Sequence, residues 1–597
     1  MKRFQLLVLA SAITAGAIWF GFYRSRHTST VAVASLLPRE TLAFIHIPDF
    51  NRARGELHET EVYKLWREPA VQDFLQKPRA KMPASSTVGP TIEEIESIGM
   101  KDAFVAVVSL EYSAWKIVGG FRYKADDAAA EKLVNHWRAK TLGGASDVKH
   151  ETVDYQGRQI QTDSAGILNF SSVHAGQWFF FANDAERLKP LLDRADGRVK
   201  DPQTVLSGDD TFLAAFHHMP SSYAAVGYAR VDQLLEKLMP AAEKNADGGM
   251  TVVRKIQSFC GATSFDDGKI RDTFFVGMPK VIETGNLTRG SLSIATKETF
   301  LYVASFLNLS KEMELGPQAA AGWLGGFQKI TSALATNGVT LEEWKSAFGD
   351  EFSLMADWPA TARIPSLFAT LPVKDSAKAK KILTTLAANK TDDTEWTQQE
   401  KDGVIYFSTA SGAKLLSLSP TIGLSDRMLV AGADAESVEA AMKRSAAGNS
   451  ELAASKKFKT AERALPTARQ AFAFVDPALI YTRLDATLRP MLFMSAAFLP
   501  GIADTVDLNK LPAAEVITKH LSPITMSQSY DGDGYVAESI GPFTVYQTLF
   551  GIGAASGAAT LLYHQQTPGM APIPTISSPA PSLSPAGSPS PSPDDSP

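Results

Sequence analysis

A single cysteine, Cys260, occurs in the chain of 597 residues. A disulfide within the chain is therefore excluded, and so is a metal site built from several cysteines. Cys260 lies in the apolar stretch SFCGATSF, which is typical of a small buried hydrophobic residue rather than a reactive thiol. The lone cysteine is compatible with the cytoplasm or with an envelope space, because a large core can stabilise a fold without disulfides.

The chain also lacks long runs of charge of one sign. It carries 59 Lys+Arg against 64 Asp+Glu, for a formal net charge of -5. A nucleic-acid surface requires clustered cations, so we expect no nucleic-acid partner. With 45% hydrophobic and 21% charged residues, the composition is that of a globular protein long enough for two large domains or more.

Local motifs for catalysis or cofactor binding are missing as well. Neither H-E-x-x-H nor G-x-S-x-G occurs. GATSFDDGK, from Gly261, has the wrong glycine spacing for a P-loop, and GIGAASG, from Gly551, is one residue too long for a dinucleotide fingerprint. DDG at 266–268 and DGDG at 531–534 fit hairpin turns better than calcium loops. We therefore predict no catalytic, cofactor-binding or metal-binding residues and no cofactor.

Two further groups of side chains, one of histidines and one of aromatic residues, are candidates for a metal site and a ligand platform. His217 and His218 are adjacent, and on an extended segment they would point to opposite faces, so we do not expect them to share a metal ion. The aromatic run Trp178-Phe179-Phe180-Phe181 predicts a buried strand rather than a platform for a ligand.

The N-terminus has the features of a targeting segment. Residues 6–23, LLVLASAITAGAIWFGFY, are uncharged and flanked by basic residues on both sides. As a helix they would span about 27 Å, enough for a thin bilayer. We predict that residues 1–35 are a signal anchor with a short linker, single-pass in the cytoplasmic membrane, with the bulk outside the cytoplasm. Small-x-small sites at 15–17 and 32–34 leave a cleaved signal peptide, and so a periplasmic or secreted protein, as the alternative.

The C-terminus has two unusual segments. Residues 544–563 are apolar and rich in Gly and Ala, and this segment is either a second membrane segment or a terminal helix packed on the last domain. Residues 564–597 are dominated by proline and serine, which predicts a disordered tail.

The remaining sequence is an internal duplication. Glu93 aligns with Glu342, a spacing of 249 residues (342 − 93), and Arg194 aligns with Arg444, a spacing of 250 (444 − 194). The opening stretch TLAFIHIPDFNRARGEL resembles TFLYVASFLNLSKEMEL, from Thr299. We therefore expect two copies of one unit, at 36–280 and 290–543.

Each unit alternates short strands, tight turns and helices. The first begins with a strand at 41–47 and closes with a hairpin, and aspartates at helix starts, such as Asp184, Asp232 and Asp434, are expected to act as caps. The pattern predicts an α+β fold: two tandem copies of a mainly antiparallel sheet with helices packed on one face.

The duplication also tests candidate sites, because a residue that is absent from one copy is not required by the fold. His46 and Asp49 invite an active-site interpretation, but Ala304 and Leu307 occupy the corresponding positions. We therefore read this stretch as a scaffold strand.

The stretches LLPRETLAFIHIPDFNR, EVYKLWREPAVQDFL and SYDGDGYVAESIGPF resemble uncharacterised envelope proteins of Verrucomicrobia-like bacteria, whose duplicated domains of unknown function open with an LPADT-like strand. The resemblance covers nearly all of both units and implies no activity. The sequence departs from it at Arg39 and Glu40, where a small residue and an acid are usual.

These features together predict a membrane-anchored envelope protein that acts without catalysis, as a scaffold or binding module, with an envelope protein or lipid as partner. Two alternatives remain. A carrier or sensor of an apolar ligand or lipid would need an apolar cavity of several hundred Å³ between sheet and helices. A hydrolase without a local motif would need His, Asp or Ser side chains that converge between the two copies.

Overall fold

The computed structural model describes residues 30–81, 92–111, 114–124, 127–142, 147–165, 168–238, 254–280, 285–306, 334–388, 395–409, 419–498, 507–545 and 547. The chain divides into a compact unit, Met1–Tyr546, and a second unit, Gln547–Pro597. The predicted N-terminal membrane segment, nearly all of segment 544–563 and the tail lie outside the described residues. Within the described part, no helix has both the length and the apolarity needed to cross a bilayer.

The described residues form ten strands in each half of the compact unit. The strands of the first half are β1 (Ala43–Asp49), β2 (Lys101–Glu111), β3 (Ala114–Arg122), β4 (Lys149–Tyr155), β5 (Arg158–Ala165), β6 (Leu168–Ala175), β7 (Trp178–Ala182), β8 (Ala225–Ala229), β9 (Ser258–Asp266) and β10 (Lys269–Gly277). Those of the second half are β11 (Thr299–Phe306), β12 (Glu351–Asp357), β13 (Ser366–Pro372), β14 (Trp396–Lys401), β15 (Val404–Thr409), β16 (Thr421–Leu424), β17 (Met428–Gly432), β18 (Ala471–Val475), β19 (Ile524–Asp531) and β20 (Gly534–Gly541).

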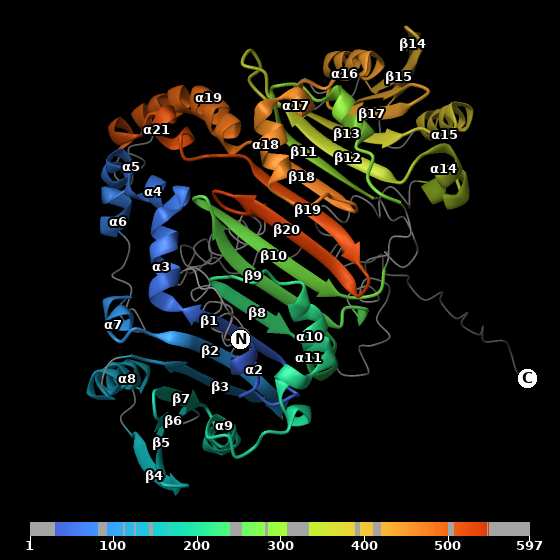
Figure 1. Cartoon of the computed structure of the whole chain (residues 1–597). Coiled ribbons are helices and arrows are strands. Elements are labelled where there is room, and N and C mark those ends of the chain that lie inside the picture. Colours follow the sequence, from blue (N-terminus) through green and yellow to red (C-terminus); the bar gives the residue numbers. More distant parts are fainter. Residues whose placement is uncertain are drawn as a thin grey trace, which may run out of the picture. The chain divides into compact units, whose positions relative to one another are not determined.

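All these strands belong to one 20-stranded sheet, and all its pairings are antiparallel. The first half has the order β4-β5-β6-β7-β3-β2-β1-β8-β9-β10. The second half repeats it as β14-β15-β16-β17-β13-β12-β11-β18-β19-β20. The last strands of the two halves, β10 and β20, pair with each other and make the sheet continuous (Figure 1). The predicted α+β class with a large antiparallel sheet is therefore confirmed.

The helices of the first half are α2 (Thr30–Ala34), α3 (Phe50–Glu59), α4 (Glu61–Arg67), α5 (Pro69–Phe74), α6 (Gln76–Lys81), α7 (Ile92–Ser97), α8 (Asp127–Leu142), α9 (Leu188–Ala195), α10 (Asp210–His217) and α11 (Val231–Leu238). Those of the second half are α14 (Leu341–Ala347), α15 (Ser376–Ala388), α16 (Ala435–Ala447), α17 (Glu451–Ala454), α18 (Lys456–Arg463), α19 (Pro477–Phe498) and α21 (Ala514–Thr518). Helix α2 lies in the stretch expected as a linker, and Thr30, Val33 and Ala34 are buried in it.

Helices cover both faces of the sheet, so the prediction that they pack on one face was wrong. Phe179 and Phe180 are neighbours on β7 and therefore point to opposite faces. Phe179 packs in a core cluster with residues of α8, whereas Phe180 packs in another with residues of α9 and α10. Leu429 and Val430 on β17 repeat the arrangement with α15 and α16. The aromatic run that was expected to form a buried strand is β7, and its continuous apolarity reflects burial on both faces.

Matched arginines make matched contacts in the two halves. Arg194 donates through Nη1 to the carbonyl oxygen of Leu36 at 3.3 Å. Arg444 donates through Nε to the carbonyl oxygen of Ile294 at 2.7 Å. Each arginine thus ties the helix that follows β7 or β17 to the segment that opens its own half.

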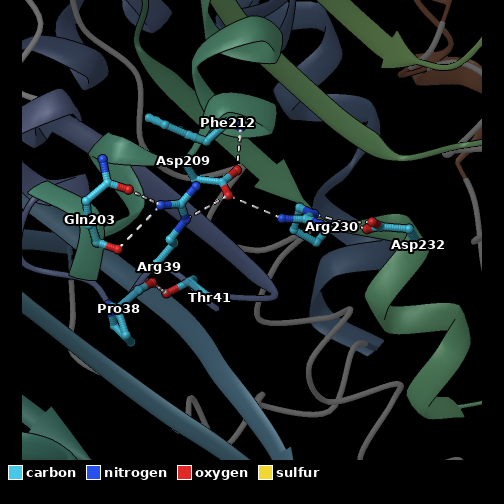
Figure 2. A network of polar contacts seen from close by, with 8 residues as sticks. All are labelled: Pro38, Arg39, Thr41, Gln203, Asp209, Phe212, Arg230 and Asp232. Atoms are coloured by element: carbon cyan, nitrogen blue, oxygen red, sulfur yellow. Dashed lines mark hydrogen bonds and ion pairs between the residues drawn. The ribbon is translucent and has the colours of Figure 1, made fainter.

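The opening segment of the first half is also held by an ionic network (Figure 2). The Oδ2 atom of Asp209 lies 3.6 Å from Nε of Arg39 and 3.5 Å from Nη1 of Arg230. Arg39 also donates to Oε1 of Gln203 at 2.6 Å. The other carboxylate oxygen of Asp209 accepts from the backbone N–H of Phe212 at 2.9 Å and so caps α10. This network holds the side chain of Arg39 in place.

The prediction that aspartates cap helical turns is confirmed for Asp434 and Asp184 but is wrong for Asp232. Asp434 accepts from the backbone N–H of Ser437 at 2.8 Å and caps α16, and Asp184 accepts from Glu186 at 3.1 Å at the turn before α9. Asp232 does not cap a helix. It lies inside the first turn of α11 and accepts a hydrogen bond from Arg230 at 2.9 Å.

Cys260 lies on β9 and is fully buried, as predicted. Burial raises the pKa of its thiol well above the ordinary value, because the thiolate would have to exist without water. We expect native protein to leave a thiol reagent such as dithiobis-nitrobenzoate unconsumed over the time in which urea-unfolded protein reacts completely. Equal reaction rates in the two states would contradict this placement.

Candidate functional site

A hollow of about 170 Å³ lies between helix α8 and strands β5 and β6 of the first half. Its polar lining comes from Glu131, Asn135 and Arg138 on the helix, Gln159 and Gln161 on β5, and Ser172 and His174 on β6. Residues 159 and 161 alternate along β5 and so share one face, as do 172 and 174 on β6. The helix and the two strands therefore direct these seven side chains into one space.

Arg138 is at the centre of this group, and its guanidinium is fixed on every side. Nε lies 2.7 Å from Oδ2 of Asp163, and Nη1 donates to Oδ1 of Asn135 at 3.0 Å. Nη2 donates to Oε1 of Gln161 at 3.2 Å and to Oγ of Ser172 at 2.9 Å. The planar fork of arginine suits such a fixed geometry, so the hollow has a rigid cationic wall.

The charge of Arg138 is compensated by Asp163, whose side chain is only 5% exposed. The other oxygen of Asp163 contacts Nδ1 of the exposed His150 at 2.5 Å. At the opposite end of the hollow, Nδ1 of His174 lies 3.2 Å from the hydroxyl of Tyr123. The site thus presents amides, a hydroxyl, an imidazole, the carboxylate of Glu131 and one paired cation.

The same place in the second half is an apolar core. Ser172 pairs with Gln161 across β5 and β6, as Ile422 pairs with Phe407 across β15 and β16. The residues of the hollow, Arg138, Gln159, Gln161, Asp163, Ser172 and His174, correspond in this way to Ala387, Ile405, Phe407, Thr409, Ile422 and Leu424. Five of these six counterparts are apolar and Thr409 is the exception, so the fold does not require the polar side chains of the first half.

The residues singled out from the sequence lie elsewhere. His46 is fully buried on β1, and its Nδ1 lies 2.6 Å from Oγ1 of Thr30. Asp49 is separate from it: its carboxylate caps α3 through the N–H of Arg52 at 3.1 Å and pairs with Lys101 at 2.8 Å. The two residues therefore form no common site.

His46 instead belongs to a buried chain of polar side chains. Its Nε2 lies 3.6 Å from Oδ1 of Asp102, and Asp102 is paired with Arg122. Burial lowers the pKa of His46, and Asp102 only partly opposes this, so the imidazole is neutral. Thr30, His46 and Asp102 have the order of a nucleophile, a base and an orienting carboxylate. Their exposures are 0%, 0% and 2%, so a substrate cannot reach them.

His217 and His218 were expected on an extended segment, and this was wrong. His217 is the last residue of α10, and His218 is its C-terminal cap. The ring of His218 stacks on Phe275 at 4.3 Å. In the described part of the chain, no three His, Cys, Asp or Glu side chains gather closely enough to hold a metal ion.

A second hollow, of about 230 Å³, lies near the junction of the halves and is lined in part by Glu56, Ser264, Asp266 and Arg271. Arg271 contacts Asp266 at 2.8 Å and reaches Glu538 of the second half at 3.0 Å. Its guanidinium is thus occupied by structural ion pairs, which favours a role in joining β10 to β20.

Helices of the two halves are joined by an ionic clasp made of Glu61, Glu68, Lys519 and His520. Nδ1 of His520 lies 2.8 Å from Oε2 of Glu61, and Nε2 lies 2.9 Å from Oε1 of Glu68. Lys519 contacts the same Glu68 oxygen at 2.6 Å. The clasp connects residues of α4 and its C-terminal cap with residues that follow α21, across more than 450 positions of sequence.

The clasp predicts a dependence on pH. Burial alone would raise the pKa of Glu61, but hydrogen bonds from His520 and Lys64 leave it below the ordinary 4.5. Hydrogen bonds from Lys519 and His520 lower the pKa of Glu68. Lowered folded-state values stabilise the clasp above about pH 4.5, and the contribution is lost as the pH falls below it. We expect His520→Ala to lower the melting temperature at pH 6, by no more than about 3 °C, and to have no effect near pH 3.

The control for this clasp experiment is His217→Ala, which changes an exposed histidine outside the clasp. It should leave the melting temperature unchanged at both pH values. A difference between wild type and His520→Ala that persists at the lower pH would contradict the role given to the two glutamates.

Comparisons with known proteins give little further guidance. No family model matches the chain, and no curated protein matches it. Two crystal forms of a protein called TP0453 resemble it in structure. Form III has a TM-score of 0.23 at 8% identity and covers 42% of this chain and 81% of its own. Form I has a TM-score of 0.21 at 7% identity, with 42% and 80% covered. Likeness at this level carries no argument about function.

Proposed function

We propose that this protein is a non-catalytic binding module of the cell envelope and that the polar hollow beside α8 is its binding site. The N-terminal segment, residues 6–23, tethers it to the cytoplasmic membrane with the sheet outside the cytoplasm. The two halves are copies of one ancestral unit, as their common strand order supports. After duplication, the first copy acquired the site and the second kept an apolar core.

The observation that carries this proposal is the contrast between matched positions. Replacing an apolar core by polar side chains around a hollow costs stability unless each polar group is paired. In the first half, the hydrogen bonds of Arg138 offset this loss of stability. The second half folds with mainly apolar side chains at the matched positions and needs no such network. A costly arrangement that folding does not require is expected where a ligand is bound.

The lining indicates a small polar ligand without a large net charge. The hollow, at about 170 Å³, is small. Gln159, Gln161 and Asn135 offer both donors and acceptors, Asp163 already balances the charge of Arg138, and Glu131 adds a carboxylate that disfavours an anion. Such groups suit a ligand of neutral hydroxyl or amide groups rather than an apolar one.

The test uses a variant filled with the residues of the second half: Arg138→Ala, Gln159→Ile, Gln161→Phe, Asp163→Thr, Ser172→Ile and His174→Leu. Wild type and variant are incubated with a small-molecule extract of the native envelope and examined by native mass spectrometry. We expect a bound polar molecule on the wild type alone. The single variant Gln161→Phe, which places a large side chain in the hollow, should also lose it.

The outcome is interpretable only for folded protein, so melting temperatures are measured in parallel. Equal binding to wild type and filled variant would overturn the proposed site. Neither alternative function has a comparable observation in its favour, because both described hollows are lined by polar as well as apolar side chains and the buried Thr30-His46-Asp102 chain is inaccessible.

A further inference from the structure

Helix α19 carries a cluster of exposed apolar side chains that the fold of its half does not use. Six large residues, Leu484, Leu488, Met491, Leu492, Phe493 and Met494, are each between 37% and 60% exposed. Four of them, at 484, 488, 491 and 492, follow the spacing of one helix face. Scattered apolar residues on a surface are common, but a contiguous group of this size marks a docking surface. We call this group the apolar face of α19.

The first half provides a comparison for this helix as well. Helix α11 follows β8 as α19 follows β18, and β8 and β18 occupy equivalent places in the sheet. The described part of α11, VDQLLEKL, contains three charged residues, whereas the stretch from Pro490 to Met494 in α19 contains none. The uncharged apolar run of α19 thus has no counterpart in the described part of α11.

The base of α19 is fixed firmly to the body of the second half. Asp476 accepts from the N–H of Leu479 at 3.1 Å at the start of the helix. Arg483 donates to the carbonyl oxygen of Trp358 at 2.9 Å, and Arg489 donates to that of Pro512 at 2.6 Å. The helix beyond Arg489 has no charged side chain as far as Met494. The apolar face is thus presented by a helix whose base is held rigidly.

We propose that the apolar face of α19 inserts into the surface of a lipid bilayer. This inference rests on the proposed N-terminal tether. Residues 24–29 are all that separate the uncharged segment 6–23 from Thr30, whose side chain is fully buried. Six extended residues span about 20 Å, so the tether holds the folded body close to the bilayer.

The character of the helix fits a bilayer surface and not a crossing. The charged residues Arg483, Asp485 and Arg489 all precede Pro490, so of the apolar face only Met491 to Met494 can enter hydrocarbon. Helices that lie at the interface combine such a polar base with large apolar residues such as Leu and Phe. A second contact in addition to the tether would also fix the orientation of the sheet toward the membrane.

The experiment uses the full-length chain with Cys260→Ala and one added cysteine, labelled with the polarity-sensitive fluorophore NBD. The test site is Met494→Cys, and the matched control is Leu238→Cys at the end of α11, which is 47% exposed. Each protein is incorporated into phosphatidylcholine and phosphatidylglycerol vesicles with or without a spin-labelled lipid. We expect a blue shift and several-fold quenching at 494, and neither at 238.

Flotation of the vesicles separates this inference from the proposed function. If the protein floats but the label at 494 resembles the label at 238, the tether holds and the insertion of α19 is refuted. If the label at 494 shifts to the blue without lipid quenching, and more so at higher protein concentration, a second copy covers the face and the proposal is again refuted. Protein that does not float at all overturns both proposals.

Discussion

Substituting proline for Ala537 is expected to uncouple the two halves of the sheet. Ala537 lies on β20 between Phe274 of β10 and Gln528 of β19, and it is buried. Proline has no N–H, so one ladder hydrogen bond is lost whichever neighbour accepts it, and a carbonyl is left unpaired in the centre of the sheet. We expect a loss of about 2–4 kcal/mol in the free energy of unfolding.

The two halves should also cease to unfold together. Because β10 and β20 pair along eight residues each, we expect one calorimetric transition for both halves of the wild type and two for Ala537→Pro. Ala537→Gly is the control, since it keeps the N–H and should cost only about 1 kcal/mol. A proline variant that melts at the wild-type temperature in one transition would show that β10–β20 pairing does not couple the halves.

A threonine at Gly120 is expected to destabilise the first half. A Cβ atom at Gly120 would lie 2.5 Å from the ring of Phe180 and 2.8 Å from the carbonyl oxygen of Phe179, so the backbone or the ring must move. Overpacking of this kind costs about 1–3 kcal/mol. Phe180→Val, which leaves a cavity beneath a fully buried ring, is expected to cost about 2–4 kcal/mol.

The second half provides the compensating pair. Gly120 faces Phe180 across β3 and β7, and at the matched place Thr370 faces Val430 across β13 and β17. The double variant Gly120→Thr/Phe180→Val is therefore expected to be more stable than the sum of the single effects predicts, by about 1 kcal/mol or more. Urea unfolding of the four proteins measures this coupling. Strict additivity would mean that the two positions do not pack against each other as described.

Much of the secondary structure was accessible from the sequence. The strand expected at 41–47 is β1 at Ala43–Asp49, and the closing hairpin with its turn at 266–268 is β9–β10. Local periodicity and turn residues carry this information, because they act over a few positions. Of the three aspartates predicted to cap helices, only Asp232 does not, because its carboxylate accepts a hydrogen bond from Arg230 instead.

The candidate site was missed, although its signal is present in the duplication. Gln161 and Phe407 are 246 residues apart (407 − 161), whereas Ser172 and Ile422 are 250 apart (422 − 172). The loops between these short strands differ in length, so an alignment of the two copies cannot set the register of both strands at once. The hydrogen-bonded strand pairs in the structure set the register. The matched positions then show polar residues in the first half and mainly apolar residues in the second.

The sequence by itself determined the elements and their order within each half, since alternation of side chains along a strand and capping at a helix end are local effects. The tertiary structure decided three further features: the pairing of β10 with β20, the covering of both faces by helices, and the hollow beside α8. Each depends on contacts between segments far apart in the chain. The sequence of an apolar strand such as β7, or of a strand such as β10 that has one edge unpaired within its own half, is compatible with several partners. Packing of the whole molecule selects one of them.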